Sequence, residues 1–161
     1  MPLVPLTLQT LMVYLSGLFL GARGGALSQI LYIAIGVLGL PVFTGGGGPA
    51  YVVSPTFGYI LGFIFASAAS GHFAKRGGMW WPAVGVAIAI LVVYIFGLPY
   101  FYLVVKYVLG KEISLPGTIE LGFLPFIFGD VIKATFALVI FYSARSALGL
   151  PIAESAGRSS D

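Results

Sequence analysis

Apolar residues fill long stretches of this chain on every face, and polar residues are confined to the segments between them. Five such stretches run over about 6–21, 25–40, 56–73, 80–97 (with a short continuation over 100–109) and 121–142. Runs such as AVGVAIAILVVYIFG lack the alternation of apolar and polar residues that marks a membrane-spanning strand. A helix that crosses a bilayer needs about 17–25 apolar residues. The pattern predicts an all-α integral membrane protein, a bundle of five transmembrane helices, with the first two slightly short.

Prolines agree with this division of the chain. Six prolines are expected at or beyond helix ends, where a missing N–H costs least. They are Pro41, Pro49, Pro55, Pro82, Pro99 and Pro116. Pro125 is expected in the first turn of the last helix.

Composition points to the same class of protein. Of the 161 residues, 59% are hydrophobic and 8% are charged, whereas a soluble domain has about 25% charged residues. So few charges cannot build a surface that faces water, so lipid must cover most of the protein. The net charge of +3 is too small and too scattered to indicate a nucleic-acid partner. We predict one transmembrane domain over 1–150 and a short cytoplasmic tail over 151–161.

Residues for covalent or metal chemistry are scarce. The chain has no cysteine and a single histidine, His72, which excludes disulfides, thiolate nucleophiles and multi-histidine metal sites. Its sequence contains no GxxxxGK[ST] phosphate-binding loop and no HExxH motif. We therefore expect neither an enzyme nor a bound cofactor. Any energy source must come from elsewhere.

Basic residues gather in alternate connections between the apolar stretches. They are Arg23, Lys75, Arg76, Arg145 and Arg158. The positive-inside rule assigns these connections to the cytoplasm, so we expect a multi-pass protein of the plasma membrane with a cytoplasmic C-terminus. Five spans would then leave the N-terminus outside, and a helix missing ahead of the first stretch would remove this oddity.

Two ionisable residues, Asp130 and Lys133, lie inside the last apolar stretch and, three residues apart, share one helical face. An isolated charge in the bilayer costs about 2.5–3.5 kcal/mol, so such groups face a partner or a cavity. A paired acid and base keep some hydrogen-bonding capacity, which suits a solute with donors and acceptors. The alternative is a self-neutralising pair that only locks helices together. A proton relay is disfavoured because the apolar stretches hold no second acid.

Glycine-rich segments give two further expectations. The connection 41–55 reads PVFTGGGGPAYVVSP, and its four consecutive glycines can bring backbone close to a ligand. Together with the long connection 98–120, it fits either a lid or an ordinary surface loop. Gly17, Gly21 and Gly25 recur every four residues, and this spacing favours close packing between helices of the same chain.

Four segments are similar to a known family. They read TLQT at 7–10, GARGGALSQILYIAIGVLGLPVFTGGGG at 21–48, SPTFGYILGF at 54–63 and GDVIKATFAL at 129–138. Through these segments, and over about 2–148, the chain resembles the BioY family, the biotin-binding S components of energy-coupling-factor (ECF) vitamin importers. The family more often has glycine where Ser54 and Phe57 stand, and Phe57 would put bulk at the mouth of the third stretch.

The resemblance implies a six-helix bundle, five helices of it present here, that binds biotin on its outer side. The implied substrate-binding residues are Asp130, Lys133, Tyr59, Thr56 and Gly58, with Gln29 and Tyr32 as further candidates. The implied partners are biotin, a transmembrane coupling subunit, two ATP-binding subunits and the surrounding lipid bilayer. Two alternatives remain: an S component for another vitamin, or a structural or regulatory membrane subunit with no small-molecule ligand.

Overall fold

The protein is described by a computed structural model over residues 7–76 and 78–149, and this part of the chain is built from helices. The helices are α1 (Gln9–Val37), α2 (Phe57–Ala74), α3 (Trp81–Leu103), α4 (Leu115–Gly122) and α5 (Leu124–Ala147), with a 3-10 turn at Pro49–Val53 and a π-helical turn at Val104–Val108. By length and composition, α1, α2, α5 and α3 with its extension to Val108 can each cross a membrane. The predicted all-α membrane fold is confirmed. The five helices differ from the five predicted spans, because α1 joins the first two stretches and α4 is a short additional helix.

A sharp bend divides α1 into two arms. Gly21 at the bend has φ 75° and ψ 177°, a conformation that only glycine adopts without strain. The arms fold back on each other: a side chain on Gly25 would begin 2.8 Å from the Cα atom of Gly17. The first arm, from Gln9 to Leu20, is about 18 Å long at about 1.5 Å per residue, so it cannot cross a hydrocarbon core of about 30 Å. The first arm alone is therefore too short to span a membrane.

The glycine stripe of α1 packs against small residues of α2. A Cβ atom on Gly17 would lie 2.0 Å from the Ser70 Oγ atom, and one on Gly71 would lie 2.4 Å from the carbonyl carbon of Gly21. Ser67 and Ser70 are fully buried at this contact. Without side chains at these positions, the two backbones can approach closely. The expected internal role of the stripe is confirmed.

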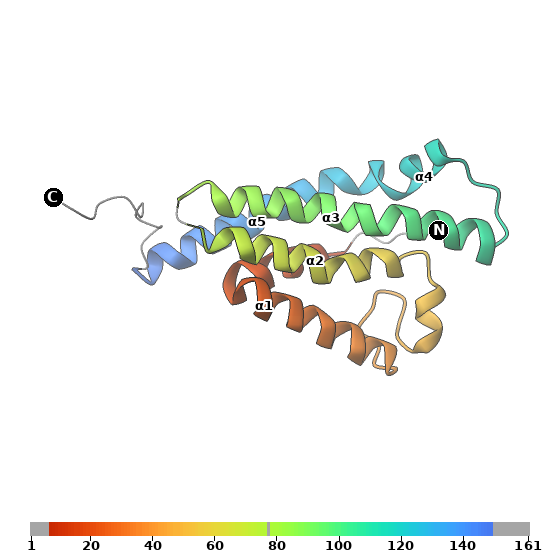
Figure 1. The fold of residues 1–161 in the computed structure, drawn as a ribbon, viewed down its shortest axis with the longest axis horizontal. Helices are drawn as coiled ribbons and strands as arrows, with labels where there is room; N and C mark the ends of the chain where they lie inside the picture. The colour runs from red at the N-terminus through yellow and green to blue at the C-terminus, as the bar shows by residue number, and fades with distance from the viewer. Residues whose placement is uncertain (1–6, 77, 150–161) are drawn as a thin grey trace.

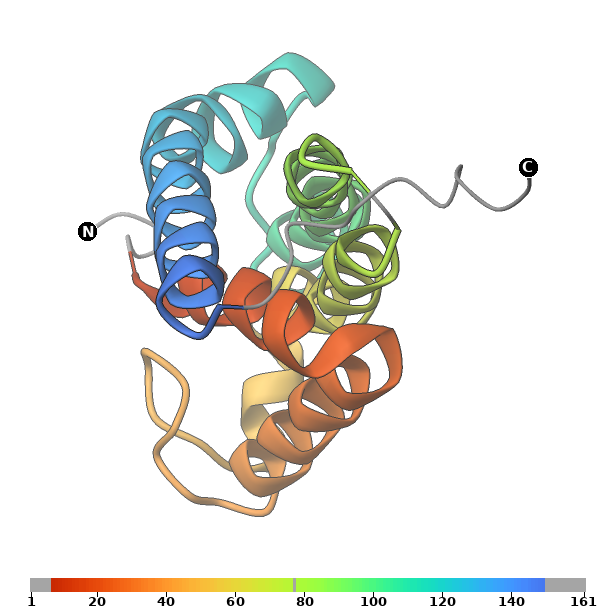
Figure 2. The same ribbon diagram turned by 90° about the vertical axis from the view of Figure 1, so that its left-hand side faces the viewer.

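Packing is uneven across the bundle. Figures 1 and 2 show α2 and α3 side by side, with the bent α1 against α2 and with α5 on the far side of α1. Among the candidate spans, α2 is the most buried, whereas α1 and α5 are the least buried. On α5, Phe128, Ile132 and Phe136 are exposed and would face lipid. α5 therefore packs on the bundle through one face, on which Phe126 and Phe141 are buried.

The charges separate to the two ends of the bundle. Lys75, Arg76 and Arg145 line one hollow at the end where α1 bends and α5 finishes, which is the left end in Figure 1. Lys106 and Lys111 lie at the opposite end, beyond α3. Arg158 and the predicted tail over 151–161 lie outside the described residues. The predicted segregation of charge is present among the residues that the structure describes.

Two expectations about the second half of the chain are wrong. Pro99 lies inside α3, not at its end, and the helix continues to Leu103 before widening into the π-helical turn. A proline removes one helical hydrogen bond, and membrane helices tolerate this loss where neighbouring groups satisfy the freed carbonyl. The connection 98–120 is consequently mostly helical.

We expect Gly17→Val to lower the melting temperature of the detergent-purified protein by about 3 °C or more, because overpacking of a tight contact costs about 1–3 kcal/mol. The matched control is Ala87→Val, which adds two methyl groups on the exposed face of α3. A thermal unfolding curve for each variant checks this. An equal shift in both would contradict the tight seam between α1 and α2.

Candidate functional site

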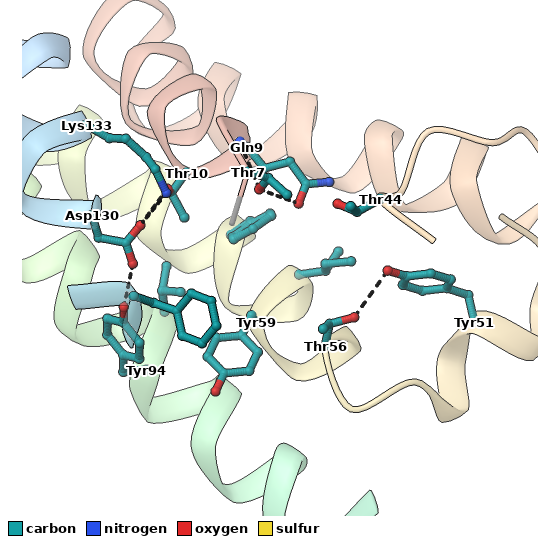
Figure 3. Close-up of a pocket in the computed structure, with 14 residues that line it drawn as sticks. Thr7, Gln9, Thr10, Thr44, Tyr51, Thr56, Tyr59, Tyr94, Asp130 and Lys133 are labelled. Carbon is teal, nitrogen blue, oxygen red and sulfur yellow. Dashed lines mark hydrogen bonds and ion pairs between the residues drawn. The ribbon is translucent and has the colours of Figure 1, made fainter. Parts of the chain in front are cut away.

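Asp130 is buried at the junction of three helices. Its Oδ1 atom accepts hydrogen bonds from Lys133 Nζ and Thr10 Oγ1, both at 2.9 Å. Its Oδ2 atom accepts one from the Tyr94 hydroxyl at 2.5 Å. Figure 3 shows the carboxylate between these groups, which come from α1, α3 and α5. A charge that would be expensive alone is thereby paired and hydrogen-bonded.

Lys133 keeps bonding capacity after pairing with Asp130. Its ammonium donates to Asp130 and, at 3.3 Å, to Thr10 Oγ1. An ammonium has three N–H donors, so these contacts leave one available. The Lys133 side chain is 13% exposed and lines the adjoining cavity. The pair can therefore bond to a further molecule without separating.

The N-terminal end of α1 adds an electrostatic field that favours the negative charge of Asp130. Gln9 and Thr10 form its first turn, and Thr10 contacts the carboxylate directly. Backbone N–H groups at a helix N-terminus carry a partial positive charge that stabilises anions nearby. The contact between Thr10 and Asp130 places the N-terminal end of α1 at the level of Asp130 in the bundle. A helix that begins within the membrane beside a buried charge is also found at transporter binding sites.

A narrow cavity of about 60 Å³ adjoins the pair. Its polar lining consists of Thr7, Gln9, Thr10, Thr44, Tyr51, Thr56, Tyr59, Tyr94, Asp130 and Lys133. Ile60, Phe63, Val93 and Phe126 supply apolar walls. Aromatic and aliphatic walls with a few convergent polar groups are typical of small-molecule sites.

The structure brings Tyr59 and Thr56 to this cavity with the charged pair. The Tyr59 hydroxyl donates to the Gly122 carbonyl oxygen at 2.8 Å, so its ring, and not its hydroxyl, faces the cavity in Figure 3. The Thr56 hydroxyl lies 3.2 Å from that of Tyr51, which comes from the connection 41–55. These residues join the start of α2 to the glycine-rich connection.

Three other candidate residues lie elsewhere. Gly58 faces α3, where a Cβ atom would lie 2.2 Å from the Tyr100 Cβ atom. Gln29 and Tyr32 line a second hollow, which also includes residues of the first arm of α1. Gln9 and Phe63 line both this hollow and the cavity, and Gln9 Nε2 donates to the Tyr32 hydroxyl at 2.5 Å. None of these three residues lines the cavity beside Asp130 in this structure, and their part in binding stays a prediction.

Two residues central to the site were not singled out from the sequence. Thr10 belongs to the TLQT segment, and nothing in the sequence indicates that it contacts Asp130, 120 positions away. Tyr94 is a lone tyrosine in an apolar run, where an aromatic residue is usually part of the core. Phe57, expected at the mouth, packs instead against Phe43 and Tyr100, with ring centroids 6.5 and 6.1 Å away.

Comparison with known proteins identifies the family of the chain. The profile of the BioY family matches residues 1–150. The chain belongs to the BioY family. It is 37% identical over 158 residues to a protein of Lysinibacillus sphaericus named probable biotin transporter BioY, with 91% of this chain and 80% of the relative covered. It is also 37% identical to a Thermotoga maritima protein named biotin transporter BioY, with 85% and 78% covered.

A solved structure supports this membership in the BioY family. It is described as the S-component for biotin from an ECF-type ABC transporter, and it matches with a TM-score of 0.67 at 28% identity. The match covers 91% of this chain and 78% of that chain. The fold of the described bundle is therefore that of an S component.

We expect Tyr94→Phe to destabilise the protein by about 1–3 kcal/mol, because the Asp130 carboxylate loses a buried donor. The control is Tyr107→Phe, since Tyr107 is 69% exposed. Chemical or thermal unfolding in the same detergent measures both. Equal stability of the two variants would show that the Tyr94 contact contributes nothing.

Proposed function

We propose that this protein is the substrate-binding subunit of a biotin importer, which captures biotin from the outer side of the plasma membrane. Membership of the BioY family and the printed names of its relatives support this substrate. Delivery would require a separate ATP-driven module, with a transmembrane coupling subunit and two ATP-binding subunits. The chain itself would be a carrier and not an enzyme, with its C-terminus in the cytoplasm.

One observation carries the proposal: a buried acid and base share the wall of a cavity and retain bonding capacity. Biotin has a ureido ring with two N–H donors and one carbonyl acceptor, an apolar body and a carboxylate. The remaining lone pairs of Asp130 can accept from an N–H, and the third N–H of Lys133 can donate to an oxygen. Tyr59 and Phe126 supply apolar surface for the rest of the molecule.

Biotin would have to widen this cavity, since pockets for molecules of its class are usually about 300–1,000 Å³. The connection 41–55 forms part of the rim through Thr44 and Tyr51. Within it, Gly46 and Gly48 have φ values of 114° and 106°, and Gly45 to Gly48 offer the backbone freedom for a hinge. We propose that this connection acts as a lid.

A structural role of the pair is the alternative that the geometry also supports, because Asp130 joins α5 to α1 and α3. In that case, variants of the pair would lower stability and leave biotin binding intact. An S component for another vitamin would use the same pair for a different polar solute. Competition between biotin and other vitamins for the purified protein separates that possibility.

We expect Asp130→Asn and Lys133→Ala each to weaken biotin binding by about tenfold or more, since a hydrogen bond to a charged group contributes about 1.5–3 kcal/mol. The matched control is Lys111→Ala, which removes a charge from an exposed position outside the cavity. Isothermal titration with detergent-purified protein measures each affinity.

Thermal unfolding of the same samples separates lost binding from lost folding. Equal affinity in wild type and both variants would remove the pair from the site. Absence of binding by folded wild type would remove biotin as the ligand. Lower stability with unchanged affinity would favour the structural role.

A further inference from the structure

Another hollow, distinct from the one lined by Gln29 and Tyr32, lies at the end of the bundle opposite the glycine-rich connection. It has a volume of about 470 Å³ and lies between the bend of α1, the end of α2 and the end of α5. Along α5, Arg145 at this hollow is about 22 Å from Asp130 at about 1.5 Å per residue, so the hollow is separate from the cavity. The biotin-binding proposal does not use it.

The lining of the hollow combines cations with apolar surface. Lys75, Arg76 and Arg145 contribute positive charge, whereas Phe19 and Leu148 contribute apolar side chains. Among the described residues that line it, none is acidic. A ligand for this hollow should therefore carry negative charge and an apolar portion.

Two of the cationic groups lie against other parts of the chain. The Lys75 ammonium lies over the bend of α1, where a Cβ atom on Gly21 would be 2.8 Å from Nζ. The Arg76 guanidinium lies 4.6 Å from the centroid of the Phe73 ring and 5.0 Å from that of Trp81. Groups that are already positioned lose less entropy when they bind a ligand.

Tryptophans place the hollow at the boundary between lipid and water. Trp80 is 75% exposed and Trp81 is 37% exposed, directly after the connection that carries Lys75 and Arg76. Exposed tryptophans concentrate at the level of lipid headgroups. The cations thus lie at headgroup depth, with Phe19 and Leu148 available to acyl chains.

We propose that this hollow binds the phosphate headgroup of an anionic phospholipid. The phosphate lies among Lys75, Arg76 and Arg145, and an acyl chain lies against Phe19 and Leu148. Lysine and arginine both bind phosphate oxygens through charge-assisted hydrogen bonds. Basic pockets between membrane helices on the cytoplasmic side have this chemistry. The bound lipid ties the bend of α1 to the end of α5.

The test uses the full chain purified in neutral detergent and supplied with phosphatidylglycerol or phosphatidylcholine. Native mass spectrometry measures how much of each lipid stays bound. We expect wild type to retain phosphatidylglycerol about tenfold more strongly, and the double variant Lys75→Gln/Arg145→Gln to lose most of this preference. The matched control is Lys106→Gln/Lys111→Gln, which removes two charges at the opposite end and should keep the preference.

Circular dichroism and gel filtration verify that each variant is folded, and the single variant Lys75→Gln, at an exposed position, serves if the double variant fails to fold. Equal retention of both lipids by wild type would overturn the proposal. The same loss of preference in both double variants would also overturn it. If inorganic phosphate displaces the lipid or stabilises the protein as well as phosphatidylglycerol does, the lipid assignment is wrong. A wild-type dimer formed through this face without lipid would assign the hollow to a second copy.

Discussion

The position of α5 depends on the hydrogen bonds of one carboxylate. Asp130 accepts from Thr10 of α1, from Tyr94 of α3 and from Lys133 of its own helix. Elsewhere α5 exposes large apolar side chains such as Phe128 and Ile132, which lipid can solvate as well as another helix can. Van der Waals packing alone therefore specifies its placement weakly. The buried acid supplies the direction and the register that apolar contacts do not.

The pair of Asp130 and Lys133 makes the proposed binding site compatible with a stable fold. Because Thr10 and Tyr94 satisfy part of the hydrogen-bonding capacity of the Asp130 carboxylate, the buried acid is tolerated whether or not another molecule is present. Lys133 keeps a donor directed to the adjoining cavity, so its remaining capacity is accessible and not sealed in the helix contact. The close glycine packing of α1 on α2 positions the first arm, and with it the Thr10 hydroxyl.

Sequence reasoning was most reliable where the constraint was local. Asp130 and Lys133 could be found because charge inside an apolar run is costly and three residues place them on one face. Thr10 and Tyr94 could not, since their role depends on which helices become neighbours. The neighbours of Gln29 were unpredictable for a related reason, because they depend on the angle of the bend in α1, and a pattern of residue types does not give that angle.

The distance along the chain between Thr10 and Asp130, 120 residues, constrains how the protein can be made. The ribosome completes the first arm of α1 long before it makes α5. In the nascent protein, the Thr10 hydroxyl is therefore present before Asp130 exists to accept its hydrogen bond. No shortened translation product that stops before α5 can assemble the charged wall of the cavity. The proposed affinity for a solute at that wall would therefore be acquired only after α5 has been made and inserted.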